Sequence, residues 1–453
     1  STGYGNGGAG IGGGKESSGA TNIEITGDAL VSAGSSGSAA IGSGESSTGE
    51  TTINIHDTNP EKGVKSAFAY GGAGIGSGRY AKGKTYVTIS NASVSTLETP
   101  AASTNTSGAG IGTGYGSQSN ADITITESTV KAVGGTGAAI GSGSEGDVFS
   151  PPTGDPNTFK TIIRITDSNV TASSGPSAAI GSGSYSTNAT DIHINGGKIE
   201  ASNYSGSAIG SGNRAKGNTD ILIKGATKVT AKGGSTAAGI GSGNGSNGST
   251  IINIEGGTIT AEGGGKENGS CQASGAGIGS GGNALNKTTI NIKGGEITAT
   301  GGGSLDSRNH SDKWLSGAGI GSGSNVSGET EINISGDSTI KSASGGKYGG
   351  AGIGSGSYSG STPDNKKGAV TINITDGTIE KAEGKDGGAG IGSGYYGRSS
   401  TVNISSNAEL KDVKGGNLAA GIGSGYDSGK VDVVIDGGTI IATGGDSAAG
   451  IGS

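Results

Sequence analysis

One short motif, Ala-Gly-Ile-Gly-Ser-Gly, recurs with small changes along the whole 453-residue chain. Intervals of 29 to 42 residues separate its fourteen copies. Such a recurrence is typical of repeat proteins, in which one structural unit stacks on the next. We therefore predict one continuous solenoid over residues 1–453, and we expect it to be an excised or mature segment of a longer protein. The isoleucines of the motif, called marker isoleucines below, are Ile11, Ile41, Ile75, Ile111, Ile140, Ile180, Ile209, Ile240, Ile278, Ile320, Ile353, Ile391, Ile422 and Ile451.

The two glycines that flank each marker isoleucine follow different rules. The residue before the isoleucine is Gly in ten copies and Ala in four, at Ala40, Ala139, Ala179 and Ala208. A position that accepts Ala does not need a positive φ, so this leading Gly is selected for small size. The residue after the isoleucine is Gly in all fourteen copies. That strictness indicates a positive φ or a backbone contact too close for a Cβ atom.

The interval from Ile240 to Ile278 shows the plan of one repeat. Apolar and polar residues alternate over 252–254 and again over 258–261, as in strands with one buried face. Gly256-Gly257 predicts a corner between these strands, and the next motif supplies a third short strand. The sequence therefore predicts an all-β fold, a single-stranded parallel β-helix with three short strands per coil and about thirteen coils.

Strand periodicity also predicts which side chains of this repeat point inward. These are Ile252, Ile254, Ile259, Ala261, Ala276 and Ile278. Ser280 has the same parity, and its position holds Ser in twelve of the fourteen copies. We expect these small hydroxyls to form a column, bonded either to one another or to the backbone of a corner.

Composition narrows the possible functions. Gly accounts for 102 residues and hydrophobic residues for only 29%, values that often indicate disorder, but the apolar residues here are periodic. The net charge of −7 and the lack of a basic run argue against nucleic acid as a partner. No apolar stretch is long enough for membrane insertion. With one cysteine, Cys271, and three histidines, we expect no disulfide framework, no metal site and no cofactor.

Five successive repeats place Asn at the same outward position of the first strand: Asn253, Asn291, Asn333, Asn373 and Asn403. Amides stacked at the spacing of parallel strands can bond to one another along the stack. We interpret this column as a structural ladder and not as a binding site.

Aromatic residues are the best candidates for a binding site. Seven of the twelve tyrosines directly follow a motif, and four of them, Tyr358, Tyr395, Tyr396 and Tyr426, come from three consecutive repeats. Such rings can stack on sugars, or they can cap a corner and cover core atoms. Trp314, the only tryptophan, lies on a long insertion with Arg308, His310 and Asp312. It is either the anchor of that insertion or a second binding ring.

Catalysis has little support in the sequence. Asp191 and Asp220 occupy one outward position of adjacent repeats, as the paired carboxylates of a glycosidase would require. With thirty-seven acidic residues on about thirteen coils, such a pair arises by chance. We therefore expect a protein that is not an enzyme.

The motif together with Ile-Asn-Ile-x-Gly-Gly-Thr-Ile-Thr-Ala at 252–261 resembles repeat regions of large secreted or surface proteins of Gram-positive bacteria. These regions are often labelled carbohydrate-binding and are similar to right-handed parallel β-helices that bind plant cell-wall polysaccharide. The resemblance implies an extracellular or cell-surface adhesin that binds a polysaccharide or host glycan. The alternative is a structural stalk or filament segment that self-associates into fibres by lateral packing of a bare Gly-rich face.

Overall fold

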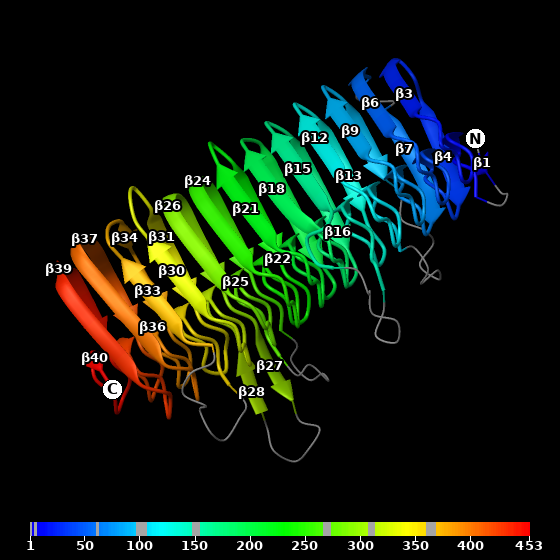
Figure 1. Ribbon diagram of the computed structural model, residues 1–453. Helices are drawn as coiled ribbons and strands as arrows, with labels where there is room; N and C mark the ends of the chain where they lie inside the picture. Colours follow the sequence, from blue (N-terminus) through cyan, green and yellow to red (C-terminus); the bar gives the residue numbers. More distant parts are fainter. Residues whose placement is uncertain are drawn as a thin grey trace. The chain divides into compact units, whose positions relative to one another are not determined.

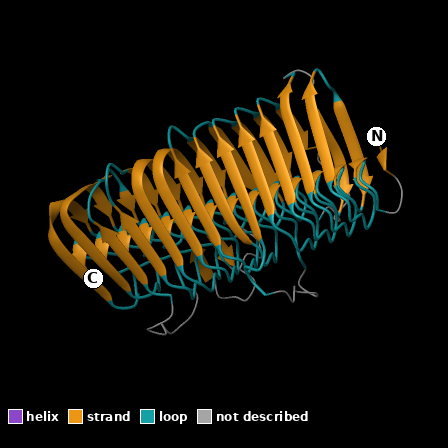
Figure 2. Ribbon diagram, turned by 45° about the horizontal axis from the view of Figure 1, so that its top comes forward, coloured by secondary structure: helices purple, strands orange, loops and turns teal. Residues whose placement is uncertain are grey.

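The computed structural model describes residues 2–3, 7–59, 63–96, 107–146, 155–265, 273–306, 313–358 and 368–453. The chain divides into two compact units, Ser1–Thr219 and Asp220–Ser453. Each is described by itself, so the prediction of one continuous solenoid stays a prediction. The described residues form strands, turns and loops and contain no helix (Figure 2).

Each repeat of unit 1 contributes a first strand, a second strand and a two-residue strand at the marker isoleucine. The first strands are β3 (Thr21–Gly27), β6 (Thr51–Thr58), β9 (Thr85–Ser90), β12 (Ala121–Thr126), β15 (Lys160–Thr166) and β18 (Ala189–Asn195); the second strands are β4 (Val31–Ser36), β7 (Val64–Tyr70), β10 (Ser93–Thr96), β13 (Thr129–Val133), β16 (Asn169–Ser174) and β19 (Lys198–Asn203); the marker strands are β2 (Ile11–Gly12), β5 (Ile41–Gly42), β8 (Ile75–Gly76), β11 (Ile111–Gly112), β14 (Ile140–Gly141), β17 (Ile180–Gly181) and β20 (Ile209–Gly210). A short strand, β1 (Thr2–Gly3), pairs with β4.

Unit 2 follows the same plan, but several of its first and second strands are continuous. Its strands are β21 (Thr219–Lys224), whose first residue belongs to unit 1, β22 (Lys228–Lys232), β23 (Ile240–Gly241), β24 (Thr250–Glu262), β25 (Ile278–Gly279), β26 (Thr288–Thr300), β27 (Gly303–Asp306), β28 (Lys313–Ser316), β29 (Ile320–Gly321), β30 (Thr330–Ile334), β31 (Thr339–Ser344), β32 (Ile353–Gly354), β33 (Val370–Ile374), β34 (Thr378–Ile379), β35 (Ala382–Glu383), β36 (Ile391–Gly392), β37 (Ser400–Lys414), β38 (Ile422–Gly423), β39 (Val431–Thr443) and β40 (Ile451–Gly452). β27 and β28 form an antiparallel hairpin that stands out from the other strands of this unit (Figure 1).

Corresponding strands of successive repeats pair in parallel, position by position (Figure 1). In unit 1, Ile123 lies opposite Ile163, and in unit 2, Ile290 lies opposite Ile332. The marker strands pair in the same way, for example Ile111 with Ile140. This pairing confirms the predicted parallel β-helix, in which equal positions of adjacent repeats form columns.

Isoleucine and alanine columns form the core of each unit. All six residues predicted to point inward in the repeat from Ile240 to Ile278 are at most 1% exposed. Twelve of the fourteen marker isoleucines are fully buried. Ile11 is half-buried and Ile451 is 46% exposed, because β2 pairs only with β5 and β40 only with β38 among the described strands. Burial of one such side chain contributes about 1.5–3 kcal/mol, so stacked turns supply most of the stability.

Both predictions for the trailing glycine are confirmed. All fourteen copies have a φ between 129° and 142°. A Cβ atom on Gly279 would lie 1.8 Å from the carbonyl oxygen of Gly321 in the next turn. The leading Gly277 has no such φ, but a Cβ atom there would lie 2.7 Å from the backbone nitrogen of Thr300. The leading position is therefore glycine because of its small size. The trailing position is glycine because of its positive φ and because a Cβ atom would clash with the next turn.

The hydroxyl column bonds mainly to backbone. The N–H of Gly323 donates to Ser280 Oγ at 3.0 Å, and the same bond joins Ser242 to Gly281 and Ser322 to Gly356. Each Ser thus accepts from the Gly that follows the equivalent Ser one turn later. This contact satisfies a buried N–H group in every turn where it forms.

Two expectations need correction. The corner at Gly256-Gly257 does not end the strand: β24 continues through it, because Gly257 bends the backbone at φ 93° while pairing with β26 resumes after a register shift. The Gly motif is also not a bare outer face. Ala276, Gly277, Ile278, Gly279 and Ser280 are all buried, since the leading glycine packs against the end of a second strand.

Candidate functional site

The tyrosines predicted to bind a ligand gather on one part of unit 2. This group, called the tyrosine cluster below, consists of Tyr358, Tyr395, Tyr396 and Tyr426. The rings of Tyr395 and Tyr426 are stacked, with centroids 5.4 Å apart and planes 10° from parallel. Tyr396 meets both rings edge-on, at 4.5 Å and 6.2 Å. The backbone N–H of Tyr358 donates to the carbonyl oxygen of Tyr395 at 3.1 Å, which places Tyr358 on the adjacent turn. The structure therefore brings the predicted residues together.

Tyr395 is the most enclosed ring of the cluster. A Cβ atom on Gly387 would lie 2.5 Å from Tyr395 Cδ2, so the ring lies directly over glycine backbone. Burial and, as the next largest cause, a hydrogen bond with Tyr396 together raise the pKa of Tyr395 to about 12. This phenol stays protonated at every physiological pH. Tyr426 is 40% exposed and offers the most accessible ring surface of the four.

A cation that was not predicted from the sequence completes the cluster. The guanidinium of Arg398 lies 4.5 Å from the ring centroid of Tyr358. Arginine over an aromatic face is held by the quadrupole of the ring. Arg398 lies further from the end of the motif than the tyrosines do. The repeat period alone therefore does not predict that it contacts Tyr358.

The scaffold does not require tyrosine at these positions. The first residue after the motif, where Tyr395 and Tyr426 lie, is serine in four other repeats: Ser144, Ser184, Ser324 and Ser357. The second residue, where Tyr396 lies with a φ of 48°, is asparagine in two repeats that share this left-handed conformation, Asn283 and Asn325. Aromatic side chains here therefore add something that the turn itself does not need.

Trp314 lies on β28, paired opposite Leu305 in the hairpin. Its side chain is outside the described part of the structure, as are Arg308, His310, Asp312 and Cys271. The choice between an anchor and a binding ring for Trp314 thus stays open.

The Asn column is a ladder, as predicted. Each amide donates its Nδ2 to the Oδ1 of the preceding Asn, at 2.8 to 2.9 Å, in four consecutive bonds along Asn253, Asn291, Asn333, Asn373 and Asn403. Asn253 in turn donates to Asp220. Because the interior amides bond to one another, the ladder stabilises pairing between turns.

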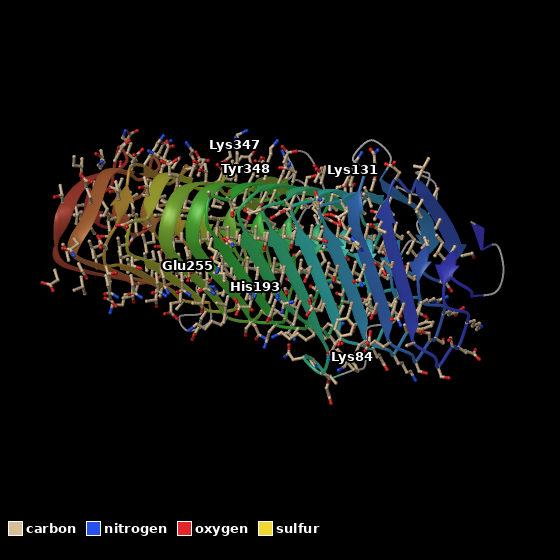
Figure 3. The ribbon with its side chains drawn as sticks, turned by 90° about the horizontal axis from the view of Figure 1, so that it is seen from above. Lys84, Lys131, His193, Glu255, Lys347 and Tyr348 are labelled. Carbon is tan, nitrogen blue, oxygen red and sulfur yellow. The ribbon has the colours of Figure 1, made fainter. Side chains whose placement is uncertain are left out.

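The second strands carry charged side chains that pair on the surface. The Nζ of Lys341 lies 2.9 Å from Oε1 of Glu380, and the Nζ of Lys198 lies 2.6 Å from Oε1 of Glu200. Figure 3 shows Lys131 of β13 on the same kind of outer surface in unit 1. The carboxylate of Asp191, considered above for catalysis, forms an ion pair with Lys160 at 2.6 Å. Exposed pairs of this kind add little to stability, because water and salt screen the attraction between the charges.

Unit 1 contains a second aromatic group that sequence reasoning did not select. Arg79 lies 4.6 Å from the ring centroid of Tyr80 and 5.4 Å from that of Tyr115, and it donates to Tyr80 Oη at 2.8 Å. The two rings meet edge-on at 5.7 Å. Arg79 and Tyr80 are adjacent in the sequence and directly follow the motif, so their contact could be predicted from the sequence.

A comparison with known protein families identifies the family to which the repeats belong. The family described as Beta helix repeat matches nine stretches, residues 123–144, 163–184, 192–213, 221–244, 252–282, 290–324, 332–357, 372–395 and 433–453, which together cover about half of the chain. The chain belongs to this beta helix repeat family. Most of these stretches run from the first strand to the residues after the next motif, so each corresponds to one turn. Comparisons with curated proteins and with solved structures found no match.

The residues that the family match covers in this beta helix repeat protein are mainly scaffold positions. Over the described residues, no three His, Cys, Asp or Glu side chains are grouped so that they could hold a metal ion. No helix long and apolar enough to cross a membrane occurs in the same part of the chain.

Proposed function

We propose that this beta helix repeat protein is a non-enzymatic extracellular or cell-surface adhesin that binds a polysaccharide or host glycan at the tyrosine cluster. One observation carries the proposal. Tyr395, Tyr396 and Tyr426 gather within 4.5 to 6.2 Å of one another, at positions that are serine or asparagine in other turns. Rings with an apolar body and a polar hydroxyl suit the mixed surface of a sugar.

The arrangement of the rings changes how a glycan would lie. The sequence places the four rings on three consecutive turns, where each could stack on a sugar separately. Tyr395 and Tyr426 instead stack on each other, so each covers one face of the other. A glycan then contacts the exposed part of Tyr426, the phenol hydroxyls and the edge near Arg398. Each contact is weak, and useful affinity requires a polymer that engages several groups at once.

The structural alternative loses its proposed contact surface. A stalk that packs laterally through a bare Gly-rich face needs that face exposed. The motif from Ala276 to Ser280 is buried, and the same holds for Ala318 to Ser322. Self-association through another surface would support the stalk. Sedimentation of the protein without glycan tests it, because a self-associating protein sediments as an oligomer.

The test replaces each tyrosine of the cluster by a residue that the scaffold accepts at the same position in other turns. The variant is Tyr358→Ser, Tyr395→Ser, Tyr396→Asn and Tyr426→Ser. We expect retention on a panel of immobilised polysaccharides to fall at least tenfold. A glycan array with the parent protein identifies the sugars to be used.

The control is Tyr185→Asn, which removes an isolated tyrosine beside Arg214 in unit 1 and should leave retention unchanged. The melting temperature of both variants is measured in parallel. If the cluster variant keeps its retention, the cluster is not the binding site. If it unfolds instead, the rings cover the core and the binding role is rejected.

A further inference from the structure

Unit 1 contains a pocket of about 430 Å³ that the sequence did not indicate. It opens beside Gly116, the second residue after the motif at Ile111. Its volume lies within the range of about 300–1,000 Å³ typical of small-molecule sites. The described residues that line it include two aromatic side chains, Tyr80 and Phe159, and two carboxylates, Glu145 and Asp155.

The pocket exists because one side chain is missing from a column. Tyr80, Gly116 and Glu145 occupy the same position after the motif in three successive turns. Gly116 has a φ of 62° and contributes no side chain between the other two. A Cβ atom there would lie 2.7 Å from Cδ1 and Cε1 of the Tyr80 ring, so the ring borders this space directly. Asp155 and Phe159 close another side.

Glu145 fixes the opposite wall. Its carboxylate accepts hydrogen bonds from Ser186 Oγ at 3.0 Å, from the N–H of Thr187 at 2.9 Å and from Thr187 Oγ1 at 2.5 Å. Burial raises the pKa of Glu145, and the bonds to Thr187 oppose this shift. The same wall holds Asn188, which is 2% exposed and whose Nδ2 has no hydrogen-bond partner among the described residues. A buried amide donor without a partner is costly unless an acceptor enters.

The chemistry of the lining selects a class of ligand. Aromatic rings pack on apolar ring faces, while carboxylates and amides bond to hydroxyl groups. Both kinds of contact suit a sugar ring. None of the described residues that line the pocket is Lys or Arg, whereas two are acidic. Sugars that carry carboxylate, sulfate or phosphate groups would meet repulsion here.

We propose that this pocket binds a single neutral or amino sugar residue and discriminates against acidic sugars. It takes its ligand class from the proposed glycan-binding function, but it uses different residues in a different unit. The tyrosine cluster would hold an extended polymer by weak contacts, whereas the pocket would recognise a single sugar residue.

The decisive variant is Gly116→Asn, which fills the pocket. Asn occupies the same position with nearly the same φ in two other turns, at Asn283 and Asn325, so the variant should fold. The matched control is Gly245→Asn, at the equivalent position of unit 2, where φ is 61°. Binding is measured by saturation-transfer NMR and calorimetry with methyl glycosides of glucose, galactose, mannose, glucosamine and glucuronic acid, at concentrations on the order of 10 mM.

We expect at least one neutral or amino glycoside to bind, the glucuronide to bind at least tenfold more weakly, and Gly116→Asn to weaken binding at least tenfold. Gly245→Asn should leave it unchanged. Asp155→Asn, a change on an exposed side chain, should reduce the discrimination against glucuronide. No binding by any glycoside, or binding that survives in a folded Gly116→Asn variant, overturns the proposal. If Gly116→Asn fails to fold, Tyr80→Asn replaces it, with the same expected loss.

These outcomes are separable from those of the proposed function. Loss of polysaccharide retention in the cluster variant, with glycoside binding intact, supports both sites. Retention that persists in the cluster variant rejects the cluster alone. Glycoside binding that the cluster variant abolishes rejects the pocket as the glycoside site.

Discussion

The first strands of the two units bury the same side chains but present different ones to solvent. Ile123 and Ile125 of β12 and Ile290 and Ile292 of β26 are all fully buried. The outward position between them holds unlike residues in unit 1, where Thr124 pairs with Arg164. In unit 2, five successive turns from Asn253 to Asn403 hold asparagine at this position.

This difference shows when the outward side chains of a repeat protein bond to one another and when they are left to bind other molecules. Identical polar side chains in adjacent turns satisfy one another, as the asparagine ladder does, and stacked tyrosines cover one face of each other. Where the residues of a column differ, groups are left for other partners. The pocket between Tyr80 and Glu145 arises at such a change, where Gly116 interrupts the column. A break in the repeat thus opens space for a ligand, in addition to the exposed part of the tyrosine cluster.

The largest effect should come from the shared interior. We expect Ile278→Asp in unit 2 and Ile123→Asp in unit 1 each to destabilise by more than about 4 kcal/mol or to prevent folding, because both place a charge in a fully buried column. Chemical denaturation of the two variants measures this. A melting curve like that of the parent for either variant would show that its side chain is not in the core. A large effect in one unit only would contradict the shared interior.

A smaller effect should separate the two glycines of the motif. Gly279→Val introduces a branched side chain at φ 137° and 1.8 Å from a carbonyl oxygen, so we expect a loss of several kcal/mol. Gly277→Ala should cost about 1 kcal/mol, because four other turns accommodate Ala there by small shifts. The thermal midpoints of the two variants decide between these outcomes. Equal midpoints would mean that the strict glycine is not a backbone requirement.

The smallest effect should distinguish the outward faces. Asn333→Ala removes one amide bond to Asn291 and one from Asn373, and we expect a loss of about 1–2 kcal/mol. The equivalent change in unit 1, Thr124→Ala, should stay within about 0.5 kcal/mol. Urea titrations of both variants test the comparison. A loss as large for Thr124→Ala would show that the ladder adds no special stability.

The sequence predicted most of the scaffold. Alternation of period two identified the buried side chains of a whole repeat, and the fourteen-fold constancy of one glycine predicted its positive φ. Both signals are local, because strand geometry fixes side-chain direction and a backbone conformation excludes a Cβ atom wherever it recurs. The asparagine ladder was predicted for a related reason: equal positions of adjacent turns must lie side by side once the fold is a parallel β-helix.

The candidate sites were predicted only in part. The positions of Tyr395 and Tyr426 follow from the period, but their mutual stacking and the burial of Tyr395 over Gly387 do not. The corner expected at Gly257 also failed to end β24, because pairing with the next turn continued through the bend. The stacking of Tyr395 on Tyr426 and the pairing of β24 both join residues one turn apart, 29 to 42 positions along the chain, whereas Gly387 lies on the loop before the motif of Tyr395 itself.

By itself, then, the sequence determined the repeat, the direction of its core side chains and the glycine on which each turn depends. Only the tertiary structure decided that the Gly motif is buried, that Arg398 reaches Tyr358, and that Gly116 leaves a pocket beside Tyr80. The physical reason is the range of the interactions. Strand periodicity and φ are set within a few residues, whereas burial, ring stacking and pockets depend on which side chains of neighbouring turns and insertions meet.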